Sequence, residues 1–143
     1  MKKRGVTLLL AIFISALALS LGLGIFTIIF GELGISGTSK ESLEAFYAAD
    51  SGIECALFWD IKQQAFNDPV LGTVQCANST PLLNVTIDAN STTTRFSLLL
   101  SNSCVRVTVR KTALETIVTS LGENIACGLT GGRTVQRGLE VKY

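Results

Sequence analysis

The hydrophobic pattern begins with one long apolar stretch, from Gly5 to Phe30, that contains no charged residue. A helix rises by about 1.5 Å per residue, so a helix of this length would reach roughly 39 Å. The hydrocarbon core of a bilayer is about 30 Å thick. We therefore expect a single membrane-spanning helix over residues 6–30.

The pattern after this stretch is still helical, but glycines interrupt it. The segment Gly31–Gly37 contains three glycines. Each costs about 1 kcal/mol in a helix relative to alanine, so the segment predicts a kink or a break. Thr38 and Glu41 then match a helix-capping box. A second helical pattern covers residues 39–64, and we expect its buried face to carry Leu43, Phe46, Ile53, Leu57 and Ile61. Either one helix bends near Gly34, or two helices follow in series.

Beyond Phe66, apolar and polar residues alternate, which is typical of strands that bury one face. The alternation covers residues 83–88, 95–100, 104–110 and 134–143, with Arg137 at an apolar position of the last. A β-branched run at 115–120 has no clear face. Turn signals stand at residues 67–69, 101–103 and 131–132. We expect an α+β fold, with the long N-terminal helix packed on an antiparallel β-meander of four to five strands.

The charged residues predict an orientation for the apolar helix. Lys2, Lys3 and Arg4 precede it, which indicates a cytoplasmic N-terminus and an exported C-terminal part. Without these three, the chain has 12 − 3 = 9 basic and 11 acidic residues, a balance of −2 that does not favour nucleic acid. We interpret five further basic residues as solvated strand positions, because no aromatic residues alternate with them: Arg106, Arg110, Lys111, Arg133 and Arg137.

The composition argues against an enzyme or a metal site. The chain has no histidine, the commonest general base and metal ligand at neutral pH. No glycine-rich phosphate loop follows a strand. We therefore expect a non-enzymatic protein without a cofactor.

Four cysteines lie in the part that we expect to be exported: Cys55, Cys76, Cys104 and Cys127. An even number in a small exported domain predicts two disulfides. The spacings contain no C-x-x-C, which argues against zinc, and free thiols in a reducing compartment are the remaining alternative. Four cysteines allow three connectivities. We prefer the one that joins sequence neighbours, Cys55 with Cys76 and Cys104 with Cys127.

Two motifs within residues 1–58 resemble a known family. The sequence K-K-R-G at residues 2–5, directly before the apolar run, resembles a class III prepilin leader. Residues 44–54, E-A-F-Y-A-A-D-S-G-I-E, resemble the A-x-x-A-E/D-x-G-I/L segment of the pilin helix. The chain is similar to type IV pilin-like proteins, and at its N-terminal end most of all to PilX-type minor pilins.

The resemblance implies a mechanism. A membrane prepilin peptidase would cut between Gly5 and Val6, and Val6 would become the methylated N-terminus. The helix would then exchange lipid for the helices of other pilin subunits, and we expect its softest point at residues 22–24. A stripe of small residues is either a helix-packing face or an ordinary feature of a membrane anchor: Ala11, Ser15, Ala18 and Gly22.

The chain departs from the major pilins at the fifth mature position. Major pilins carry a glutamate there, whereas this chain has Leu10. Without that carboxylate, a neighbour's N-terminal ammonium would be buried unpaired, which is costly. We therefore expect a minor subunit at a filament tip or in a priming complex.

These expectations divide the chain into four parts. They are a leader at 1–5, a transmembrane and filament-core helix at 6–30, a kinked amphipathic helix at 31–66 and a disulfide-stapled β domain at 67–143. The protein is expected to cross the cytoplasmic membrane once and to enter an extracellular filament after assembly. Its expected partners are the membrane, other pilin subunits and prepilin peptidase.

Two alternatives remain. A conventional signal peptide cut after Ala18–Ser20 would release a secreted domain that begins at Leu21. An uncleaved signal anchor would instead hold a binding module at the cell surface. In addition, N-x-S/T motifs at Asn78, Asn84 and Asn90 permit glycosylation, although a polar surface loop is the simpler interpretation.

Overall fold

The computed structural model describes residues 3–67, 73–129 and 132–143. Within these ranges lie a long helix α1 (Lys3–Leu57), a π-helical turn η1 (Phe58–Lys62) and strands β1 (Asn84–Asp88), β2 (Ser91–Leu100), β3 (Ser103–Thr112), β4 (Thr116–Glu123) and β5 (Gln136–Lys142). The chain forms two compact units, one ending at Gly37 and one covering Thr38–Tyr143. Residues 1–2 of the expected leader, and residues 68, 69 and 131 of the expected turns, lie outside the described residues.

The first unit is the apolar part of α1. By its length and composition, this helix is able to cross a membrane. No part of its most apolar window is buried against other described residues. Its large side chains, from Val6 to Phe30, are therefore exposed in the isolated chain.

The break expected at Gly31–Gly37 is wrong, because α1 is helical throughout this segment. Each glycine costs about 1 kcal/mol, but a break would require a second, unfavourable helix nucleus. Continuing from a formed helix adds one hydrogen bond for each residue fixed. The two helices in series are therefore excluded, and the expected cap at Thr38 and Glu41 lies inside α1 instead of starting a helix.

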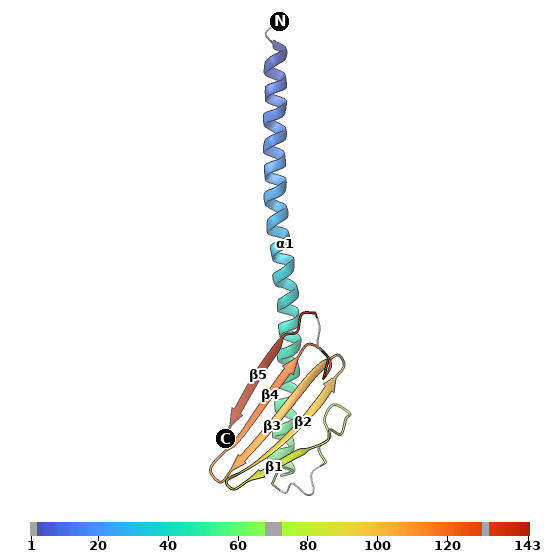
Figure 1. Ribbon diagram of the computed structural model, residues 1–143, viewed down its shortest axis with the longest axis vertical. Helices are drawn as coiled ribbons and strands as arrows, with labels where there is room; N and C mark the ends of the chain where they lie inside the picture. Colours follow the sequence, from blue (N-terminus) through green and yellow to red (C-terminus); the bar gives the residue numbers. More distant parts are fainter. Residues whose placement is uncertain (1–2, 68–72, 130–131) are drawn as a thin grey trace. The chain divides into compact units, whose positions relative to one another are not determined.

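In the second unit, five antiparallel strands lie in the sheet order β1-β2-β3-β4-β5 (Figure 1). Each strand pairs with its neighbour in sequence, with registers such as Phe96↔Val107 and Val109↔Val118. The last turns of α1 cover one face of this sheet (Figure 1). The expected α+β arrangement is confirmed, with five strands.

Strand β4 explains why the 115–120 run had no visible face. Every second residue from Thr116 to Gly122 is buried, namely Thr116, Val118, Ser120 and Gly122, and Glu123 at the end of the strand is buried as well. Only one of these four is strongly apolar. The strand has an inner face that hydropathy alone does not reveal.

The core lies between the last turns of α1 and the middle of the sheet. The ring of Phe66 stacks on that of Phe96, with centroids 6.1 Å apart. Around this pair gather mostly small and β-branched side chains, among them Ala48, Ile53, Ala56, Val74, Leu98, Val105, Val107, Val109 and Val118.

The helix face predicted to be buried is mostly wrong. Leu43, Phe46 and Ile61 are 53%, 41% and 57% exposed, whereas Ala45, Ala49 and Ala56 are 0% exposed. Of the five expected residues, Ile53 is buried and Leu57 is half-buried. The sheet covers the small-residue face of α1.

Two glycines explain this choice of face. A Cβ atom built on Gly122 would lie 2.1 Å from the carbonyl oxygen of Ala45 and 2.4 Å from the amide nitrogen of Ala49. A Cβ atom built on Gly52 would lie 2.3 Å from Oγ of Ser120 and 2.5 Å from Cγ1 of Val105. The helix backbone thus lies directly on β4, and no large side chain fits between them.

Candidate functional site

The surface of the apolar helix carries few free polar groups. Ser15 and Ser20 each donate a hydrogen bond of 2.9 Å to the carbonyl oxygen three residues earlier, and Thr27 donates one of 2.8 Å to Gly24. These hydroxyls are satisfied by their own helix, which suits an apolar environment. Such a surface is compatible with lipid or with other apolar helices.

The residues singled out on this segment lie in α1, and the side chains from Val6 onward are exposed. Leu10 is among them, and the first carboxylate after it in the sequence is that of Glu32. A Cβ atom built on Gly22 would meet no other atom within 4 Å. All four members of the stripe of small residues are therefore exposed: Ala11, Ser15, Ala18 and Gly22.

Polar contacts hold the α1 residues of the second unit to the sheet. Nε of Arg137 on β5 donates a hydrogen bond of 2.7 Å to Oγ of Ser42, and Oγ of Ser103 donates one of 3.0 Å to Oε1 of Glu44. Arg137 is the basic residue that interrupted the apolar side of its strand. Its position is explained because it reaches the helix across the covered face.

A second polar cluster joins η1, β3 and the C-terminal residue. Asp60 is buried, and its carboxylate accepts hydrogen bonds from Nζ of Lys111 at 2.5 Å and from the hydroxyl of Tyr143 at 2.6 Å. Nζ of Lys111 also donates to Oδ1 of Asn67 at 2.5 Å. Burial, the hydrogen bond to Asp60 and its negative charge raise the pKa of Tyr143 far above its usual range, so the phenol keeps its proton.

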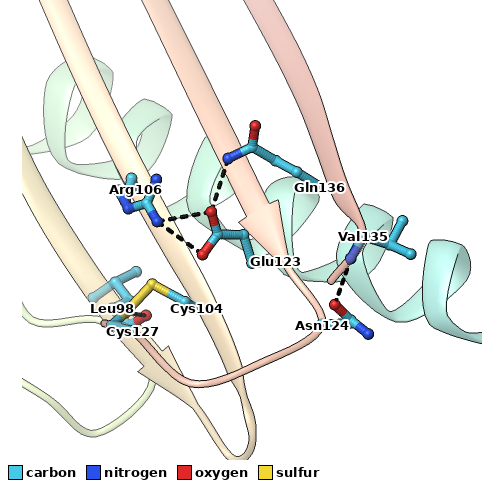
Figure 2. Close-up of polar contacts among 8 residues, drawn as sticks. All are labelled: Leu98, Cys104, Arg106, Glu123, Asn124, Cys127, Val135 and Gln136. Atoms are coloured by element: carbon cyan, nitrogen blue, oxygen red, sulfur yellow. Dashed lines mark hydrogen bonds and ion pairs between the residues drawn. A yellow bond between two sulfur atoms is a disulfide. The ribbon is translucent and has the colours of Figure 1, made fainter. Parts of the chain in front are cut away.

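A third polar cluster ties together three strands on the uncovered face of the sheet (Figure 2). Nη2 of Arg106 on β3 donates to both carboxylate oxygens of Glu123 on β4, at 2.7 and 2.8 Å. Nε2 of Gln136 on β5 donates to Oε1 of Glu123 at 2.9 Å. The carboxylate of Glu123 is thus held from both neighbouring strands.

The loop after β4 is closed at its base by one asparagine (Figure 2). Oδ1 of Asn124 accepts a hydrogen bond of 2.8 Å from the amide of Val135, and its Nδ2 donates one of 2.9 Å to the carbonyl oxygen of Arg133. The side chain of Asn124 therefore bridges the two ends of this loop.

The four cysteines form the two pairs expected from the sequence. Cys55 on α1 is bonded to Cys76, with Cα atoms 6.0 Å apart, and Cys104 on β3 to Cys127, with Cα atoms 4.8 Å apart. Both separations are typical of disulfides. Beside the first pair, Nε1 of Trp59 donates to the carbonyl oxygen of Gln75 at 3.0 Å. The bonds fasten the segment after η1 and the loop after β4 to the core.

The basic residues of the second unit do not share one surface. Arg106 pairs with Glu123 on the uncovered face, whereas Lys111 pairs with the buried Asp60 and Arg137 reaches the helix. The described residues include no group of three or more His, Cys, Asp or Glu side chains placed to hold a metal.

Comparisons with models of protein families, with curated proteins and with solved structures found no match to this chain. The function of this chain is therefore inferred from its own residues. The sequence pattern did not predict the close contact of α1 with β4 at Gly52 and Gly122, or the hydrogen bond between Arg137 and Ser42. The available signals were a glycine beside alanines in α1 and a charge at an apolar strand position.

Proposed function

We propose that this chain is a non-enzymatic subunit of a type IV pilus-like filament, held in the cytoplasmic membrane before assembly. One observation carries the proposal. A single helix supplies both an apolar segment with exposed side chains and the face that packs on a disulfide-bonded antiparallel sheet. The apolar segment requires lipid or other helices around it. Because the same helix continues into the sheet domain, it anchors that domain either to the membrane or to the other helices.

The N-terminal residues support processing of this helix. The cationic residues 2–4 would hold the helix in the membrane, and a cut between Gly5 and Val6 would remove all of them. The mature helix would then begin with an apolar segment that can leave lipid for a filament core. In this proposal the sheet domain lies outside the cytoplasm, where disulfides persist.

The absence of a carboxylate near the mature N-terminus favours a minor subunit. A terminal ammonium buried among apolar helices needs a partner, and Leu10 offers none to a neighbour. A subunit at a filament tip or in a priming complex has fewer neighbouring subunits, so fewer N-terminal ammonium groups need a carboxylate from it. Immuno-gold labelling of sheared filaments should therefore be confined to filament ends. Uniform labelling along the shaft would contradict the minor-subunit role.

The mature N-terminus tests the proposal directly. The full chain is expressed with a prepilin peptidase and its methyltransferase, and the intact mass and N-terminal peptide are measured. We expect loss of residues 1–5 and an N-methylated Val6. The Gly5→Leu variant should remain uncut, and the matched Gly24→Ala variant should be cut normally.

Other N-termini would identify other functions. A chain that begins at Met1 or Lys2 in every preparation would be a signal-anchored binding module at the cell surface. A chain that begins at Leu21 would be a secreted domain released from a conventional signal peptide. Either result refutes the filament proposal.

A further inference from the structure

The three N-x-S/T motifs converge on one edge of the sheet. Asn84 is the first residue of the edge strand β1, Asn90 lies in the turn between β1 and β2, and Asn78 lies in the turn before β1. In the sheet order, β1 pairs only with β2. The chain has six asparagines in all, and the three within such motifs are the three nearest this edge in sequence.

These three asparagines are also chemically available. All three are exposed, and none of their side chains forms a hydrogen bond with the residues that the structure describes. By contrast, Asn67 accepts a bond from Lys111 and Asn124 closes the loop after β4. The asparagines outside the motifs therefore include two with structural contacts, whereas the side chains inside the motifs have none.

The threonine two positions after each asparagine is accessible as well. Thr80 and Thr86 are exposed and Thr92 is half-buried. The N-x-S/T motif requires this hydroxyl in addition to the asparagine. All three motifs thus keep both of their required groups available.

The β1 edge has little protection of its own. An open edge strand can pair with another chain, and proteins usually block it with charged residues or proline. The other edge strand, β5, carries Arg137, Glu140 and Lys142, whereas the only charged residue in β1 is Asp88. Ile87 is 68% exposed on β1.

The surface beside Asn84 has room for a covalently attached sugar. A shallow hollow of about 570 Å³ on the uncovered sheet face is lined by Leu82, Asn84, Arg95 and Thr108, among others. Leu82 is 94% exposed there. A sugar linked to Asn84 would cover Leu82 and lie near the guanidinium of Arg95.

We propose that Asn78, Asn84 and Asn90 are N-glycosylated and that the attached glycans cover the β1 edge. The co-reactant is a sugar activated as a lipid-linked pyrophosphate. The carboxamide nitrogen bonds to the anomeric carbon, the bond from that carbon to the pyrophosphate oxygen breaks, and the nitrogen loses one proton to a base. The lipid pyrophosphate leaves with the electron pair. The inference rests on the outward orientation of the sheet in the proposed function.

Mass spectrometry of the full-length protein purified from its own cells tests the modification. We expect peptides that carry Asn78, Asn84 and Asn90 with the added masses of sugar residues. In the Thr86→Val variant, Asn84 is retained but its modification should disappear, while the other two sites stay modified. The Asn102→Gln variant, which alters no motif, should leave all three modified. Unmodified asparagine at any of the three sites overturns the proposal for that site, and at all three overturns it entirely.

The same sample separates this inference from the proposed function. A mature N-terminus at Val6 with unmodified asparagines overturns only the glycosylation. Modified asparagines on a chain that begins at Met1 or Leu21 overturn only the filament subunit.

Self-association tests the covering of the edge. The variant with all three asparagines changed to glutamine should associate at least tenfold more strongly than the native protein in sedimentation experiments in detergent. Equal association of the two proteins would overturn the protective role.

Discussion

Replacing Gly122 by alanine tests how closely α1 lies on the sheet. The new methyl carbon would lie 2.1 Å from the carbonyl oxygen of Ala45 and 2.4 Å from the amide nitrogen of Ala49. Favourable contacts between such atoms are about 3.5 Å long, so the helix would have to move outward by about 1.1–1.4 Å. Both obstructing atoms belong to the helix backbone and cannot rotate away. We therefore expect the core between α1 and β4 to open.

The size of the effect follows from two opposing terms. Overpacking of a core costs typically about 1–3 kcal/mol, and a rigid backbone obstruction puts Gly122→Ala near 3 kcal/mol. Alanine restricts the unfolded chain more than glycine does, which by itself raises the free energy of unfolding by about 0.5–1 kcal/mol. The steric term is the larger. The net loss in the free energy of unfolding should be about 2 kcal/mol, or about 8–16 °C in Tm for a unit of this size.

Trp59 is the only tryptophan and is half-buried in the second unit, so its fluorescence reports unfolding of that unit. Urea and thermal unfolding of the full chain in detergent should therefore be followed by this signal. Gly138→Ala is the matched control, because its Cβ would meet only the end of the Leu121 side chain, at 3.0 Å, and an oxygen at 3.9 Å. We expect a change within about 0.5 kcal/mol for the control. Equal midpoints for the two variants would refute the close helix–sheet contact.

Three further predictions concern the polar clusters and a disulfide. Because the pKa of Tyr143 is raised in the folded protein, its contribution to stability should be complete below about pH 10, the unfolded value, and should fall as the pH rises above it. Urea midpoints measured from pH 8 to 11 should show this fall, and a Tyr143→Phe variant with the same slope would contradict it. Lys111→Met leaves the buried carboxylate of Asp60 without its cation and should cost about 3 kcal/mol in urea unfolding. Adding Asp60→Asn should recover most of this loss, and no recovery would show that the pair is not coupled. Replacing both Cys104 and Cys127 by alanine should cost about 3 kcal/mol, because the bond spans 23 residues and restricts the unfolded chain. In reductant the native chain also loses this bond, so the difference in urea midpoint between the native chain and the variant should vanish. A difference that persists in reductant would contradict the explanation that the bond stabilises the fold by restricting the unfolded chain.

Local patterns in the sequence were sufficient for several features. The uncharged apolar run predicts a helix long enough to span a membrane because helix length depends only on residue count and rise. The alternation in β1, β2, β3 and β5 predicts antiparallel strands because side chains of a strand alternate between two faces. The preferred cysteine pairing agrees with the structure.

Other features could not be predicted from the pattern of residue types. The glycines at 31–37 suggested a break, but the helix on both sides makes continuation more favourable than a second nucleus. The inner face of β4 was hidden because threonine, serine and glycine occupy most of its buried positions. Their burial becomes visible only when α1 covers them.

The covered face of α1 shows most clearly which features the sequence determines and which depend on the tertiary structure. The sequence by itself determined that residues 39–64 are largely helical and that they contain large apolar residues, among them Leu43, Phe46 and Ile61. Only the tertiary structure decided that these three stay exposed while Ala45, Gly52 and their small neighbours meet the sheet. Periodicity records where apolar residues recur, but not how near a partner can approach. Close approach favours the face with the smallest side chains, because the backbones of α1 and β4 can then touch.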